Sequence, residues 1–127
     1  MDDPNIERLL RIPSAIEEVQ QMSPSEVVHE LVEALGAQLV AAIVCATETR
    51  VVRSWETGEA PKRVGSLRAA LQATRSILMT CSSATARSWF VGCSSRLGYV
   101  SPLEVIREDT EEGRARVVRA AVGFASD

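Results

Sequence analysis

The chain has 127 residues, of which 46% are hydrophobic and only 4% aromatic. This length fits one domain, or a small domain with a second helical lobe, and the apolar content is high enough to exclude wholesale disorder. Because Ala, Val, Leu and Ile supply most of the apolar side chains, we expect packed helices rather than a β-sandwich. The longest apolar run, residues 39–46, is far shorter than the roughly 20 residues of a membrane span. With no signal-peptide core near Met1, we expect a cytoplasmic protein without membrane contacts.

The net charge of −3 is unevenly distributed along the chain. Residues 1–47 carry eight acidic and two basic side chains, a balance of −6. Residues 48–100 carry three acidic and eight basic side chains, and residues 101–127 carry six and four, so the balances are +5 and −2. The positive charge lies where a nucleic-acid-binding face would need it, although an ordinary solvated surface produces the same pattern.

Motifs for catalysis, cofactor binding and metal binding are absent from the sequence. It contains no GxSxG, no Walker-type phosphate loop and no GxGxxG. Cys45, Cys81 and Cys93 are widely spaced, and His29 is the single histidine, which leaves too few ligands for a structural zinc site. We therefore predict a protein that is not an enzyme and uses no cofactor or metal. The cysteines are expected to be small buried residues in a reducing compartment.

Two helical segments are predicted before residue 36. Residues 4–22 carry a short apolar stripe, which Pro13 interrupts before a restart at Ser14. Ser23 can cap the next helix, and Pro24 suits its first turn. This helix ends at Gly36, and the side chains expected to be buried on it are Val27, Val28, Leu31, Val32 and Leu35.

Residues 37–58 have the pattern of a helix-turn-helix, in which the second helix can lie in a DNA major groove. Ala42 is the small residue at the helix crossing, Cys45 and Thr47 bracket the turn, and Val52 is the apolar anchor. Arginine side chains on the second helix can contact guanine or phosphate. The residues predicted to bind DNA are Thr49, Arg50, Arg53, Lys62 and Arg63.

Two positions weigh against DNA recognition. Glu48 stands at the start of the second helix, where Ser or Thr is usual, and a carboxylate there faces phosphates unfavourably. Val51 occupies a position that often carries a hydroxyl. The alternative for residues 37–58 is a helical fold used only for packing or dimerisation.

A longer helix is predicted over residues 66–80. Its apolar residues follow each other at alternating spacings of four and three, which form a narrow seam. This seam either packs on the bundle or pairs with its copy in another chain, so residues 66–80 are also a possible dimerisation helix. The seam residues are Leu67, Leu71, Thr74, Leu78 and Cys81.

The sequence pattern changes after residue 81, and we predict a boundary between regions 1–81 and 82–127. A helix bearing Trp89 and Phe90 is followed by a turn of small residues. A second strong helix start follows at Ser101-Pro102. A final helix over about 111–122 places aliphatic side chains on one side, with its three arginines, at 114, 116 and 119, largely elsewhere.

Residues 37–61 resemble an Xre-type helix-turn-helix, and residues 84–124 resemble the toxin-binding domain of the Xre/MbcA/ParS antitoxins. The second resemblance rests on the aromatic-bearing helix, the small-residue turn and the segment from Leu97 to Arg107, which is the more specific motif. Gly113 and the final aliphatic helix complete the pattern. Both parts occur in the order and at the spacing of that family.

The resemblance implies an all-α protein: a helical bundle with an Xre-like helix-turn-helix, followed by a small helical toxin-binding domain. It also implies an antitoxin that neutralises a cognate RES-domain toxin, which consumes NAD or transfers ADP-ribose from it, by occluding the toxin's active site. The implied assembly is a homodimer within a hetero-oligomeric complex, with autoregulation through operator DNA. The residues placed on the toxin are Trp89, Arg96, Arg107, Arg114, Val122, Phe124, Ser126 and Asp127.

Two of these placements have structural alternatives. The tail from Val122 to Asp127 could insert into a nucleotide-binding cleft, or it could fold onto its own core through Phe124. Trp89 fits a place in the core equally well. The alternative function for the whole chain is a stand-alone helix-turn-helix transcription regulator, which would bind DNA in a salt-dependent way.

Overall fold

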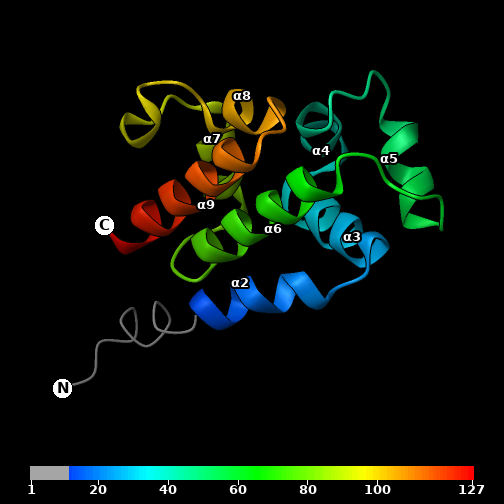
Figure 1. Ribbon diagram of the computed structural model, residues 1–127, viewed down its shortest axis with the longest axis horizontal. Helices are drawn as coiled ribbons and strands as arrows, with labels where there is room; N and C mark the ends of the chain where they lie inside the picture. The colour runs from blue at the N-terminus through cyan, green and yellow to red at the C-terminus, as the bar shows by residue number, and fades with distance from the viewer. Residues whose placement is uncertain (1–11) are drawn as a thin grey trace.

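The computed structural model describes residues 12–127, and every regular element in that range is helical (Figure 1). The prediction of an all-α fold is therefore confirmed. The part of the early apolar stripe that precedes residue 12 lies outside the described residues. In chain order the elements are α2 (Ile12–Gln21), α3 (Pro24–Leu35), α4 (Ala37–Ile43), α5 (Thr49–Glu56), α6 (Val64–Leu78), α7 (Ser83–Val91), the 3₁₀ turn η1 (Ser95–Leu97), α8 (Pro102–Arg107) and α9 (Glu111–Ser126).

Side-chain caps determine where several helices begin. Four helices follow a Ser or Thr whose hydroxyl accepts a hydrogen bond from the backbone N–H three residues later, at 3.0–3.3 Å. Each such cap stabilises a helix by about 1 kcal/mol. The starts predicted at Ser23 and Ser101 are confirmed, each with proline in the first turn. The capping residues are Ser23, Ser82, Ser101 and Thr110.

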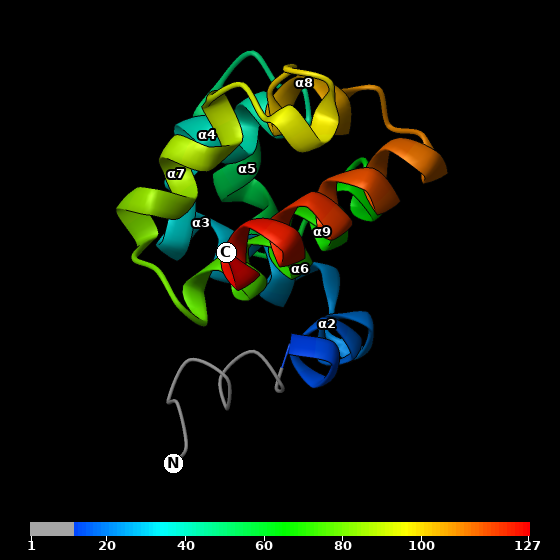
Figure 2. The same cartoon turned by 90° about the vertical axis from the view of Figure 1, so that its left-hand side faces the viewer.

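Helix α6 is the centre of the bundle, and α9 lies beside it in the same direction (Figures 1 and 2). At one end Gly65 of α6 contacts Arg114, and at the other Thr80 Oγ1 donates to the carbonyl of Ala125 at 3.2 Å. Both helices bury aliphatic residues in one apolar core, which also includes residues of α3, α4, α7 and α8. This core therefore runs across the boundary predicted at residue 81.

The predicted seam of α6 lies mostly inside this core. Leu67, Leu71 and Thr74 are fully buried within the chain, whereas Leu78 is 37% exposed and Cys81 is half-buried. The first three seam positions thus pack on the bundle, which is one of the two alternatives predicted for this seam, the other being pairing with a second chain. A dimer through this seam would have only its last two positions available.

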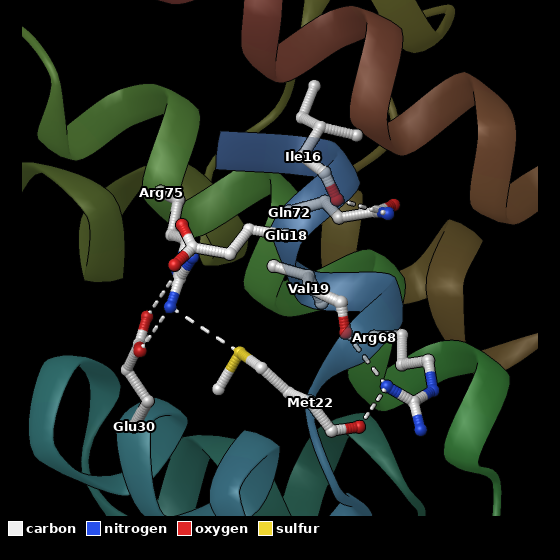
Figure 3. Close-up of polar contacts among 8 residues, drawn as sticks. All are labelled: Ile16, Glu18, Val19, Met22, Glu30, Arg68, Gln72 and Arg75. Carbon is white, nitrogen blue, oxygen red and sulfur yellow. Dashed lines mark hydrogen bonds and ion pairs between the residues drawn. The ribbon is translucent and has the colours of Figure 1, made fainter. Parts of the chain in front are cut away.

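Polar side chains of α6 attach α2 to the bundle (Figure 3). Arg68 Nη1 donates to the carbonyls of Val19 and Met22, both at 2.8 Å, and Gln72 Nε2 donates to the carbonyl of Ile16 at 3.1 Å. The carbonyls in the last turn of a helix lack intrahelical partners, and a cation also suits the negative end of the helix dipole. Arg68 therefore caps the C-terminal end of α2 from a neighbouring helix.

Arg75 links α6 to both α2 and α3. Its Nε and Nη2 donate to the carboxylate of Glu30, each at 2.6 Å, and Nη1 donates to Glu18 at 3.1 Å (Figure 3). The pKa of Arg75 is raised above its ordinary value, first by the hydrogen bonds to Glu30 and then, against the opposing effect of burial, by the charges of Glu30 and Glu18. This guanidinium therefore stays charged and holds three helices together.

The prediction that the cysteines are buried is wrong at Cys45 and Cys93, which are exposed, and Cys81 is only half-buried. Cys45 has φ +58 in the turn between α4 and α5, where the chain reverses at the surface. Cys93 lies in the loop after α7. Both lie on connecting segments, and such segments run over protein surfaces. A burial preference that holds for cysteine in general did not hold in these turns.

Helix α9 continues to Ser126, four residues beyond the predicted end at 122. Ala125 is buried and Phe124 packs against the core, so the last turn has an apolar anchor. His29 is exposed on α3, with Nε2 3.3 Å from the carboxylate of Glu33. None of the helices within residues 12–127 is long and apolar enough to cross a membrane.

Candidate functional site

Helix α5 lies at one edge of the molecule (Figure 1), and two of its eight side chains are exposed. It is anchored by Val52 and Trp55, which are 0% and 4% exposed. Arg50 and Arg53 are exposed, and Thr49 is half-buried at the helix start. Two arginines on a short helix at the edge of the molecule can reach the phosphates of a nucleic acid.

The charge on α5 is partly neutralised. Arg50 pairs with Glu48, whose side chain makes no capping bond to the helix. Both side chains are more than half exposed, so this pair is screened by water and contributes little to stability. Lys62 is also exposed, beyond the end of α5. Arg53 and Lys62 have no ion pair within residues 12–127.

An acidic groove of about 450 Å³ borders α5 on the side of α3. Glu56 contributes a buried carboxylate oxygen that has no hydrogen-bond partner among the described residues. The groove would repel a polyanion, so the favourable approach to α5 is from Arg50 and Arg53. Its lining residues are Met22, Ser25, Glu26, His29, Glu30, Glu33 and Glu56.

Arg63 and Arg107 connect α6, α8 and the turn before α5. Arg63 has φ +53 at the start of α6, and its Nη1 donates to the carbonyl of Arg107 at 2.8 Å. The Nε of Arg107 in turn donates to Sγ of Cys45 at 3.3 Å. Arg63 therefore links the start of α6 to the end of α8, and Arg107 links α8 to the α4–α5 turn. The structure places Arg107 apart from the other residues predicted to contact a toxin.

A second exposed face is formed by residues 91–100, which we call the Tyr99 loop. Within the described residues four large hydrophobic side chains are exposed, and three of them lie in this loop: Val91, Tyr99 and Val100, at 60%, 74% and 36%. Exposed apolar groups that gather in one place often mark a protein-binding surface, and tyrosine is enriched in such surfaces. The fourth, Leu78, lies at the end of α6.

The backbone of the Tyr99 loop is closed and left-handed at its tip. Gly98 and Tyr99 have φ +71 and +66, and a left-handed conformation is rare for a bulky residue. The N–H of Tyr99 donates to the carbonyl of Ser94 at 2.7 Å, and the N–H of Ser94 donates to that of Val100 at 3.1 Å. These bonds offset the conformational cost, which is about 1–3 kcal/mol. The phenol ring is thus presented by a hydrogen-bonded loop.

A hollow of about 180 Å³ lies beside this loop, and four residues predicted to bind a toxin line it. Trp89 is 8% exposed and Phe124 packs next to it, with ring centroids 6.3 Å apart. Arg96 Nη2 donates to both carboxylate oxygens of Asp127 at 2.7 Å. The lining residues are Trp89, Cys93, Ser94, Ser95, Arg96, Phe124 and Asp127.

The tail is the last turn of α9 and packs on the core through Phe124, the residue that one of its two alternatives required. Phe124 is half-buried against Trp89, and Ser126 Oγ donates to the carbonyl of Val122 at 2.8 Å within α9. Trp89 itself is a core residue, with an edge-to-face contact to Phe90 at 5.1 Å. Trp89 and Phe124 line the hollow together with residues 93–96 of the Tyr99 loop.

Arg114 lies on another side of the molecule. Its Nη1 is 2.9 Å from Asp109 Oδ1, and its guanidinium packs on Gly65. It lines a groove of about 400 Å³ among α2, α6 and α9, together with Arg68 and Arg119.

The Tyr99 loop residues that are most exposed were not predicted as site residues. Their only signal was a single tyrosine directly after a glycine, because exposure of an apolar side chain depends on which neighbours cover it.

No protein-family model, curated protein or solved structure matches the chain.

Proposed function

We propose that the chain is a non-catalytic antitoxin that binds a RES-domain toxin through the Tyr99 loop. The observation that carries this proposal is the position of the exposed apolar groups. Val91, Tyr99 and Val100 lie inside the segment whose sequence resembles the toxin-binding domain of the Xre/MbcA/ParS antitoxins. A face that is both apolar and part of that motif fits a protein partner better than a small polar substrate.

The energetics of the Tyr99 loop fit an anchor in a protein interface. A tyrosine ring buries a large apolar area and still keeps a hydroxyl for a hydrogen bond, and such residues often account for 2 kcal/mol or more of binding, on the order of a 30-fold change in affinity. Because hydrogen bonds to Ser94 close the loop, less conformational freedom is lost on binding. Arg96, which belongs to the loop, and Asp127 supply polar groups at the neighbouring hollow.

Inhibition in this proposal is steric. A toxin that consumes NAD must admit NAD to a cleft, and a protein covering the mouth of that cleft stops the reaction without any chemistry of its own. Because Phe124 is packed on Trp89 and Ala125 is buried, we assign the contact to the Tyr99 loop rather than to an inserted tail.

The test measures NAD turnover by the purified toxin at increasing concentrations of antitoxin. Tyr99→Ala should weaken inhibition by about 30-fold, as expected for the loss of a tyrosine anchor. The matched control is Leu78→Ala, which removes an exposed large apolar side chain outside the loop and should leave inhibition unchanged. Equal inhibition by the Tyr99→Ala and unaltered chains, with both fully folded, would remove the basis for this proposal.

DNA binding by α5 is a second candidate activity, either as autoregulation by the antitoxin or as the sole function of a stand-alone transcription regulator. The exposed Arg50 and Arg53 at the edge of the molecule favour it, while Glu48 and the acidic groove oppose it. An operator duplex at modest salt distinguishes the cases. A regulator must bind it, whereas an antitoxin without measurable DNA affinity can still inhibit its toxin.

A further inference from the structure

Three arginines gather on the outer side of α9 and η1. Within the described residues, Arg96, Arg116, Arg119 and Ala120 line a hollow of about 230 Å³. Arg116 and Arg119 have no ion pair inside residues 12–127, and Arg96 has one carboxylate partner, Asp127. Like charges held side by side repel each other, so an anion that enters the hollow relieves an unfavourable interaction.

Gly123 allows Arg96 to lie against α9. A Cβ atom at this position would be 2.7 Å from Nη1, 2.8 Å from Cζ and 3.0 Å from Nε of Arg96, closer than atoms pack. Glycine inside a helix costs roughly 0.5–1 kcal/mol relative to alanine. Gly123 lies one helical turn from Arg119. Because Gly123 has no side chain, the guanidinium of Arg96 can lie there, close to the arginines of α9.

The pair between Arg96 and Asp127 shows which chemistry this position accepts. The guanidinium binds both oxygens of a carboxylate at 2.7 Å, in a geometry that also suits the oxygens of a phosphate. The two side chains are 44% and 67% exposed, so the pair is weak and can exchange. Asp127 is therefore an internal anion that an external one can displace.

We propose that Arg96, Arg116 and Arg119 bind the phosphate group of a small phosphorylated molecule. A phosphate carries more charge than a carboxylate and has oxygens for all three guanidiniums, whereas Asp127 reaches only Arg96. The hollow lies on η1 and α9, whereas the arginines of α5 lie at the opposite edge of the bundle (Figure 1). The site is thus separate from the face proposed for DNA.

The test is a calorimetric titration of the full chain with inorganic pyrophosphate at low salt. We expect saturable binding of one pyrophosphate, about tenfold weaker in Arg116→Gln and in Arg119→Gln, because each loses a charged hydrogen bond of about 1.5 kcal/mol. Asp127→Asn should bind more tightly because it frees Arg96. Arg53→Gln makes the same charge change on α5 and should leave the affinity within about twofold.

Gly123→Ala tests the geometry without changing any charge. It should displace the guanidinium of Arg96 and weaken pyrophosphate binding, but less than Arg96→Gln does because Arg96 keeps its charge, with unchanged helical content. Absence of saturable binding, or an equal loss in Arg53→Gln and Arg119→Gln, would overturn the proposal. A short DNA duplex that displaces pyrophosphate and depends on Arg116 and Arg119 would assign the arginines to nucleic acid and overturn the small-molecule ligand. None of these measurements involves the toxin, so their outcome is independent of the antitoxin proposal.

Discussion

Single glycines in α6 and α9 differ in what surrounds the place of a side chain. At Gly65 the nearest group is the flexible guanidinium of Arg114, 3.1 Å from a Cβ atom. At Gly113 a Cβ atom would be 2.8 Å from Oγ1 of Thr110, the capping hydroxyl of α9, and 3.2 Å from the backbone carbonyl of Val105. The guanidinium of Arg114 can move away from Gly65. Thr110 and Val105 cannot easily move away from Gly113, because they form the cap of α9 and the backbone of α8.

We therefore predict that Gly113→Ala destabilises the protein by about 1–2 kcal/mol, chiefly through loss of the Thr110 cap. The expected fall in the melting temperature is roughly 4–8 °C, measured by circular dichroism. Gly65→Ala is the matched control and should shift the free energy of unfolding by less than about 0.5 kcal/mol, because Arg114 moves aside and alanine favours a helix. If the two substitutions lowered the melting temperature equally, contact of the new side chain with Thr110 and Val105 would not be the cause of the lost stability.

Helix boundaries were predictable where a local signal marks them. The starts at Ser23-Pro24 and Ser101-Pro102 follow from one hydroxyl, one proline and the next few residues, and the structure has both. The last turn of α9 was missed because it is anchored by contacts of Phe124 and Ala125 with distant residues. Local chemistry can be read from neighbouring residues, whereas this anchoring depends on elements far apart in the chain.

The candidate site was predictable only in part, for the same reason. Four of the eight residues predicted to contact a toxin line one hollow: Trp89, Arg96, Phe124 and Asp127. Arg107 and Arg114 belong to other contacts. Tyr99 was not predicted as a site residue, since nothing in its sequence neighbourhood shows that no helix covers it.

Helix α2 is the element whose attachment depends most visibly on polar side chains. Arg68 binds the carbonyls of Val19 and Met22, so Arg68→Ala should loosen α2 while leaving α6 in place. A single bond from a charged donor corresponds to about 1.5–3 kcal/mol, so this range is the least that the loss of both bonds should cost. We expect amide hydrogen exchange within residues 16–22 to become roughly 10- to 100-fold faster, with unchanged exchange in α6.

The control for this prediction is Arg87→Ala. Arg87 Nη1 donates to the carbonyl of Ala34 at 3.2 Å, near the C-terminal end of α3, and so makes the same type of contact with another helix. Its loss should leave exchange in α2 unchanged. If Arg68→Ala accelerated exchange equally throughout the molecule, α2 would be part of the cooperative core rather than a separately attached element.

The exposed arginines of α5, Arg50 and Arg53, form a surface that we call the α5 face. The α5 face and the Tyr99 loop pack on one common core but lie at different places on it. Figure 1 shows α5 at one edge and the segment between α7 and α8 toward the opposite edge. The two faces share no residue. One chain could therefore contact DNA and a toxin at the same time, and the two activities should be separable by substitution.

We predict that the double variant Arg50→Ala, Arg53→Ala lowers the affinity for an operator duplex by at least about tenfold and reduces its dependence on salt, because up to two phosphate contacts are lost. Inhibition of the toxin by this variant should remain intact. Tyr99→Ala should show the converse: weakened inhibition with unchanged DNA affinity. Both activities are measured on the same preparations, with melting temperatures as the check on folding. If either variant is folded and yet loses both activities, the two faces are not independent. Because the core between them is unaltered in a folded variant, DNA and toxin would then bind to the same surface.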